Sequence, residues 1–185
     1  WGFEDRNGNV DRYTYNASLQ LTGYTDERGQ TYSISHNGGG RIATLADYAG
    51  RQWAFTYDSA GNLSTITTPS TADQPSGIVI TLGYDAQGRL TSIVNGRGIT
   101  ERQYTYNGTT SQVATVTIGG NAVSYSYASG VTTRTDRNGN VHRYHFTGNR
   151  VTQTDMLVSG ASKYATQYRW SGIHLSNFVL PRGNR

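Results

Sequence analysis

The feature that most constrains this chain is a short aromatic step that recurs along its length. In this step, two aromatic or large apolar residues are separated by one position, as in Phe55-Thr56-Tyr57 and Tyr104-Thr105-Tyr106. The second members follow one another at spacings of 21, 21, 27, 22, 21, 19 and 24 residues, at Tyr15, His36, Tyr57, Tyr84, Tyr106, Tyr127, Phe146 and Trp170. Residues two apart share one face of a β-strand. The spacing therefore predicts one strand-containing unit that is repeated eight times.

Each copy has the same internal order of strand, turn, strand and turn. A glycine-containing turn follows the aromatic step, as in residues 58–62 and 85–89, and a short β-branched segment comes next, as in 63–66 and 90–93. A second turn then closes the unit. Antiparallel hairpins connect such strands most directly. We therefore expect an all-β fold, in which residues 1–185 form a strip of antiparallel hairpins whose first strands end near the eight residues named above.

The turns carry Asp and Gly for conformational reasons. Asp at a turn start accepts hydrogen bonds from the backbone two residues on, and Gly adopts the positive φ that other residues disfavour. We expect Gly61 and Gly88 to serve the turn and not a ligand. A calcium loop, the alternative, needs further carboxylates and a distal Glu that residues 136–139 do not supply. Residues 68–77 hold two of the three prolines and are predicted to form an inserted, exposed loop.

The composition favours a thin sheet over a large globular core. Of the 185 residues, 35% are hydrophobic, and 23 Gly and 14 Tyr accompany a single lysine, Lys163. The mean hydropathy is −0.60. The chain has no Cys, which excludes a disulfide framework, a thiolate zinc site and a cysteine nucleophile. No apolar run is long enough to span a membrane.

Two copies share a longer phrase, which points to a family. Residues 57–66 and 84–93 both spell Y-D-x-x-G-x-L-x-x-I. This phrase resembles the YD repeat of Rhs proteins, and the periodic order extends the resemblance over nearly the whole chain. Other copies are degenerate, with Asn16, Asn107, Thr147 or Ser171 at the Asp position. The resemblance implies a structural role for the motif residues Tyr57, Asp58, Gly61, Leu63, Tyr84, Asp85, Gly88 and Leu90.

The resemblance also implies a β-wall that curls as part of a hollow shell. In Rhs proteins, in the B and C components of Tc toxins and in teneurins, such repeats form hairpin strips of this kind, and the bacterial shells enclose a C-terminal toxin domain. The expected partners are then neighbouring repeats and an enclosed toxin domain, within a larger protein exported from a bacterium. The family's self-cleavage motif contains an Asp-Pro pair that this chain lacks. We therefore expect neither the cleaving segment nor the toxin in these residues.

The residues that carry chemistry elsewhere predict no catalytic, metal or cofactor site here. His142 and His145 are three apart on a predicted strand and should face opposite sides of the sheet. The carboxylates mostly occupy turns, and Gly38-Gly39-Gly40 lacks the strand-to-helix context of a phosphate loop. The formal net charge is +4, and residues 134–185 carry eight basic against two acidic side chains. Because the basic residues are dispersed, they favour a solvated surface over a nucleic-acid footprint.

A scaffold without enzymatic activity is therefore the main hypothesis, and a binding module is the alternative. In the alternative, exposed tyrosines on the strip hold carbohydrate or a cell-surface protein. A scaffold requires most repeat tyrosines to be packed, whereas a binding module requires a contiguous set in solvent. The chain opens inside a repeat-like phrase and stops in the turn-like residues 180–185, so we expect a fragment of a larger shell that associates through its strand edges when isolated.

Overall fold

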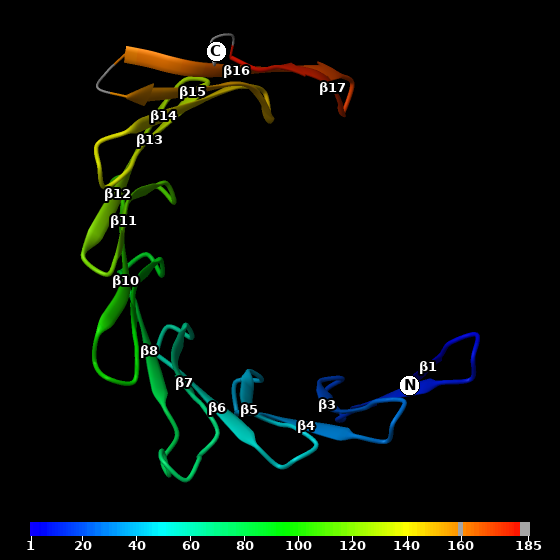
Figure 1. Cartoon of the computed structure of the whole chain (residues 1–185). Helices are drawn as coiled ribbons and strands as arrows, with labels where there is room; N and C mark the ends of the chain where they lie inside the picture. Colours follow the sequence, from blue (N-terminus) through cyan, green and yellow to red (C-terminus); the bar gives the residue numbers. More distant parts are fainter. Residues whose placement is uncertain (159–160, 182–185) are drawn as a thin grey trace. The chain divides into compact units, whose positions relative to one another are not determined.

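The computed structural model describes residues 1–158 and 161–181, and it consists of β-strands joined by short turns (Figure 1). The chain divides into one unit of residues 1–100 and another of residues 101–185. The first unit contains β1 (Gly2–Glu4), β2 (Val10–Tyr15), β3 (Leu21–Thr25), β4 (Thr31–His36), β5 (Ile42–Ala46), β6 (Gln52–Tyr57), β7 (Leu63–Thr67), β8 (Val79–Tyr84) and β9 (Leu90–Val94). No helix in the described residues is long and apolar enough to cross a membrane.

The second unit continues the same succession of strands. It contains β10 (Thr100–Tyr106), β11 (Val113–Ile118), β12 (Asn121–Ala128), β13 (Val131–Thr135), β14 (Val141–Thr147), β15 (Arg150–Val158), β16 (Ala161–Ser171) and β17 (His174–Val179). Within each unit, every strand pairs antiparallel with the next one along the chain, as β2 does with β3 and β14 with β15. The predicted all-β strip of antiparallel hairpins is therefore confirmed.

The predicted ends of the first strands are also confirmed. Strands β2, β4, β6, β8 and β10 end at the second residue of the aromatic step, and β12, β14 and β16 end one residue beyond it. The segment that we expected as an insert lies between β7 and β8. Residues 182–185, which belong to the predicted closing turn, lie outside the described residues.

A β-bulge, which the sequence analysis did not anticipate, recurs at the same place in most hairpins. Tyr57 pairs with Leu63 and Thr56 with Thr65, so Ser64 has no partner across the hairpin. The bulge brings Leu63 and Ile66, three residues apart, onto one face of the sheet opposite Tyr57 and Phe55. The L-x-x-I spacing therefore encodes a bulge. The extra residue is small in each case: Thr22, Ala43, Ser64, Thr91, Ala114, Thr152 and Ser176.

The two faces of the first unit differ in character. Strand alternation and register place the large side chains on an aromatic face, which carries Tyr13, Tyr24, Tyr32, Trp53, Phe55, Tyr57 and Tyr84. The opposite hydroxyl face carries Ser33, Ser35, Thr44, Thr56, Thr65, Thr67, Thr81 and Ser92. Cross-strand hydroxyls on it bond at 2.6 Å in the Ser35–Thr44 and Thr56–Thr65 pairs. Strands β3 to β9 contain no Asp, Glu, Lys or Arg, so the charges of this unit lie mainly in its turns.

Little of the chain is buried. In the part of the chain whose burial is described, Leu157 is the one apolar side chain classed as buried, with 4% of its surface exposed. The large residues of the aromatic face are mostly half-buried against their neighbours on adjacent strands. Backbone pairing and packing within each face must therefore supply most of the stability, because no central core does so.

Candidate functional site

The candidate site is built from the repeat motif, and it begins with the turn of the first complete motif copy. Gly61 N–H donates to Asp58 O (3.0 Å), and Asp58 N–H donates to Asn62 O (2.9 Å). The Asp58 carboxylate accepts from Asn62 N–H (2.8 Å) and from the Asn62 side-chain amide (3.0 Å). The side-chain and backbone hydrogen bonds from Asn62 lower the pKa of Asp58. This is a three-residue hairpin turn closed by a glycine with positive φ.

The second copy builds the same turn with an ion pair in place of the amide. The Asp85 carboxylate accepts from Gln87 N–H and Arg89 N–H, both at 3.0 Å, and pairs with Arg89 Nε at 2.7 Å. Burial raises the pKa of Asp85, but the hydrogen bonds from Arg89 outweigh burial, and the pKa is lowered. The side-chain oxygen of Asn16, which stands at the motif Asp position in another copy, accepts the same two backbone hydrogen bonds, from Ser18 N–H and Gln20 N–H. Replacement of the motif Asp by Asn therefore leaves the turn intact.

The two motif glycines share a conformation but have different surroundings. Gly61 has φ +87° and Gly88 has φ +74°, in the left-handed region that a side chain disfavours. A Cβ on Gly61 would meet the Arg41 guanidinium, whose carbon lies 5.6 Å from the Tyr57 ring centroid. A Cβ on Gly88 would meet only Asn62 Oδ1, at 3.7 Å. The turn at Gly61 is thus covered by a side chain from the preceding copy.

Successive copies are joined by a hydrogen bond from the last aromatic residue of the step. Tyr84 Oη donates to Leu63 O (3.0 Å), which belongs to the previous copy, and Tyr57 Oη donates to Ile42 O (2.9 Å). In the second unit, Tyr127 Oη donates to Val113 O (3.0 Å) and Trp170 Nε1 to Val151 O (2.8 Å). We call this bond the inter-repeat tie. In every case the acceptor is the residue just before the bulge.

The bulge explains why this carbonyl needs a side-chain donor. The β7–β8 ladder covers residues 65–67 and stops short of Leu63, so strand pairing with β8 does not reach the Leu63 carbonyl. Tyr84 fills that place, and burial, followed by the negative charge of Asp58, raises the pKa of Tyr84. The structure therefore brings Tyr57, Asp58, Leu63 and Tyr84 together. Leu90 lies opposite Tyr84 and repeats the position of Leu63.

A second aromatic cluster, which the motif analysis missed, runs across the first unit. The rings of Tyr13 and Tyr24 are 5.2 Å apart, those of Tyr24 and Tyr32 are 5.7 Å apart, and those of Tyr32 and Tyr48 are 6.0 Å apart. Tyr24 Oη donates to Asp11 Oδ1 (3.0 Å), and this bond raises the Tyr24 pKa to about 12. Tyr24 follows Leu21 by three residues, which is the bulge spacing and the signal that would have placed it on the aromatic face.

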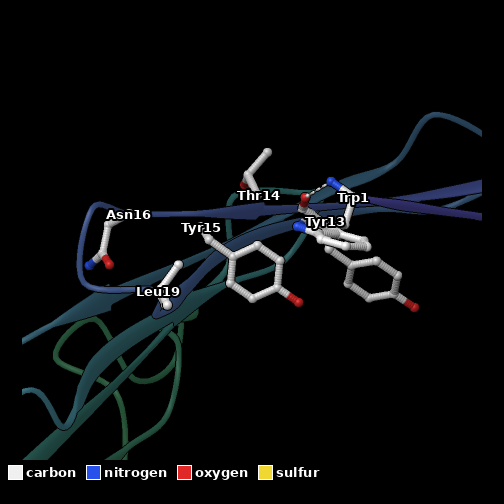
Figure 2. A pocket seen from close by; sticks show the side chains of 6 residues that line it. All are labelled: Trp1, Tyr13, Thr14, Tyr15, Asn16 and Leu19. Carbon is white, nitrogen blue, oxygen red and sulfur yellow. Dashed lines mark hydrogen bonds between the residues drawn. The ribbon is translucent and has the colours of Figure 1, made fainter.

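Exposed aromatic residues gather at one place in this unit. A hollow of about 590 Å³ is lined by Trp1, Tyr13, Tyr15 and Leu19, among others. In Figure 2 the rings of Trp1, Tyr13 and Tyr15 lie on one side of the ribbon and Thr14 lies on the other. Trp1 is 96% exposed and Tyr15 is 46% exposed. We call this group the aromatic shelf; its exposed rings lie next to one another, as a binding module requires.

The histidines form no metal site in the described residues, where no group of three or more His, Cys, Asp or Glu side chains is placed to hold an ion. His145 Nε2 lies 2.7 Å from Asp155 Oδ2, and Gln153 Nε2 donates to Asp155 Oδ1 (2.7 Å). His142 pairs across with Met156, on the opposite face of β14. The sequence analysis missed the His145–Asp155 contact because it depends on the register between β14 and β15.

Comparison with known proteins supports the motif assignment. The family model described as RHS Repeat matches residues 36–73 and 71–100. No curated protein matches the chain.

Solved structures similar to this chain include two crystal structures of TcdB2-TccC3. One contains Cdc42 (16% identity, TM-score 0.38) and the other lacks the hypervariable C-terminal region (15%, 0.39); each similarity covers 92% of this chain and 10% of the other. A structure of the Photorhabdus luminescens Tc holotoxin pore is 12% identical, with a TM-score of 0.28, over 90% of this chain and 14% of the other. This chain thus spans about a tenth of the length of the first two.

The family match and the geometry identify the same residues. The matched region contains both complete motif copies, their Asp-Gly turns and the ties from Tyr57 and Tyr84. Residues 36–100 therefore match the RHS Repeat family in both sequence and hairpin geometry.

Proposed function

We propose that this chain is a structural scaffold, a segment of an Rhs shell wall that encloses a C-terminal toxin domain in a larger protein exported from a bacterium. In this role the motif residues hold the wall together and perform no chemistry. The partners of the segment are the neighbouring repeats of the parent chain and the enclosed domain. The family match and the successive hairpins support this proposal.

The observation that carries the proposal is the inter-repeat tie. A binding site needs aromatic residues at one place, whereas the tie recurs at Tyr57, Tyr84, Tyr127 and Trp170. Each tie uses the aromatic side chain to satisfy a backbone carbonyl of the previous copy. A hydrogen bond of this kind contributes about 1 kcal/mol, and its loss leaves a carbonyl without that partner. Repeated ties join hairpins into a continuous wall, as a repeat protein requires.

Protease protection in the full-length parent tests enclosure. We expect the domain that follows the repeats to survive a trypsin concentration that digests the same domain expressed alone. The combined Tyr57→Phe and Tyr84→Phe substitutions should weaken this protection, because both ties are lost. Tyr48→Phe is the matched control, since the Tyr48 ring contacts Tyr32 but Tyr48 donates no tie. Equal digestion of the enclosed and the isolated domain would refute enclosure.

The aromatic shelf supports a second candidate function, binding of carbohydrate or a cell-surface protein. Trp1 and Tyr15 expose ring surface beside Leu19, as stacking on a sugar ring requires. Elsewhere in the first unit, by contrast, Tyr24, Tyr32 and Tyr48 pack against one another. A glycan array compares the chain with its Tyr15→Ala variant. Glycan binding that this substitution abolishes would favour the second function. An array without signal would exclude carbohydrate as the ligand.

A further inference from the structure

The loop of residues 68–78, here called the insert loop, is the longest departure from the repeat in the first unit. Its ends are joined by two hydrogen bonds, from Thr68 N–H to Ile78 O and from Ile78 N–H to Thr68 Oγ1, both 2.9 Å long. Within it, Thr71 and Gln74 exchange backbone hydrogen bonds of 3.0 and 3.2 Å. The insert loop is therefore a defined structure and not a slack connection.

The neighbouring turn of residues 95–99 is adapted to the insert loop. Its second position holds Gly96, where the corresponding turns hold Arg6, Glu27, Tyr48 and Arg137. A Cβ on Gly96 would collide with Cγ2 of Ile78. Glycine at this position has no positive φ to account for it, so the close approach of Ile78 is the physical reason for it.

Together the two segments line a hollow of about 430 Å³, in the size range of ligand pockets. Its apolar part is formed by Ile78, Val79 and Ile99, which are 43%, 43% and 56% exposed. Arg97 lies at the same hollow, and no carboxylate lines it. Among the described residues, the basic members of the ion pairs are Arg51, Arg89 and His145, so the Arg97 guanidinium is available to an acidic partner.

We propose that this hollow binds a partner segment that presents an aliphatic side chain next to a carboxylate. The aliphatic group covers Ile78, Val79 and Ile99, while the carboxylate pairs with Arg97, which offers planar, two-pronged donation. Charge complementarity selects this occupant, because the lining supplies a cation and no anion. The hollow lies where the insert loop meets the turn of residues 95–99, so this turn differs from the turn of residues 26–29, which has no insert loop beside it.

Three small probes separate the two parts of the proposed ligand. N-acetyl-leucine carries both an aliphatic side chain and a carboxylate, N-acetyl-leucinamide lacks the carboxylate, and N-acetylglycine lacks the aliphatic group. Each is titrated into the ¹⁵N-labelled 185-residue chain while amide chemical shifts are followed. We expect N-acetyl-leucine to shift the amides of Ile78, Val79, Arg97 and Ile99, and to bind at least ~10-fold more tightly than either control.

Matched variants test the role of Arg97. Arg97→Gln should weaken N-acetyl-leucine binding at least ~10-fold, and Arg97→Lys should restore only part of it, because lysine keeps the charge but not the planar, bidentate donors. Arg28 holds the equivalent position in the turn of residues 26–29, which lacks an insert loop, so Arg28→Gln should leave the affinity unchanged. Absence of shifts at the hollow, equal binding of N-acetyl-leucinamide, or an unchanged affinity of Arg97→Gln would each overturn the proposal.

Discussion

The two motif glycines allow the cost of backbone conformation to be separated from the cost of a neighbouring contact. Gly61 and Gly88 both have positive φ, so replacement by alanine costs each turn about 1–2 kcal/mol in strain. Only at Gly61 does the new Cβ displace the Arg41 guanidinium from its place beside Tyr57. An exposed cation–π contact is worth about 0.5–1 kcal/mol. Gly61→Ala should therefore destabilise more than Gly88→Ala by about 0.5–1 kcal/mol.

Thermal unfolding followed by circular dichroism measures this difference. For a chain of this size, 1 kcal/mol corresponds to a shift of about 2–4 °C in Tm, so Gly61→Ala should melt about 1–4 °C below Gly88→Ala. The Gly61→Ala and Gly88→Ala substitutions are then each made in an Arg41→Ala background. There the guanidinium is absent, and the two alanine variants should melt together. Equal melting in the wild-type background, or a difference that persists without Arg41, would refute the assignment of this contact.

Three further predictions follow from the turns, the tyrosine cluster and the strand edges. Leu19 holds the glycine position of its turn, with φ +59°, and is 85% exposed, so its backbone conformation is strained without compensating burial. Leu19→Gly should therefore raise the free energy of unfolding by about 1 kcal/mol, measured by urea denaturation. A lower free energy of unfolding would contradict backbone strain at Leu19. Tyr24 has its pKa raised to about 12 from 10.0, so its stabilising bond to Asp11 is fully present below pH 10 and is lost as pH rises through about 12. Asp11→Asn should bring the ultraviolet titration of Tyr24 towards 10.0, and an unchanged titration would exclude Asp11 as the cause. The isolated chain should associate through its strand edges, so its mass by light scattering should rise with concentration; a constant monomer mass would favour an independent binding module.

Local sequence rules predicted the strands and many of their connections. Aromatic residues two apart, as in Phe55 and Tyr57, can share a face only in an extended strand, so they specify β6 before any contact is known. Asp58 and Gly61 specify a turn because the carboxylate bonds the backbone within four residues and glycine tolerates positive φ. Such interactions lie within a few positions along the chain. Sequence alone was therefore sufficient for the all-β class and for the strand ends.

The tertiary structure decided how one copy meets the next. Tyr84 reaches Leu63 across 21 residues, and Arg41 covers Gly61 across 20, so neither contact follows from a local propensity. Both depend on register, which the bulge at Ser64 sets by moving Leu63 and Ile66 onto one face. Gly96 likewise has no local explanation until Ile78 is placed beside it. Sequence determined the elements because their causes are short-range, whereas the ties and the hollow required the strand pairing that brings distant residues together.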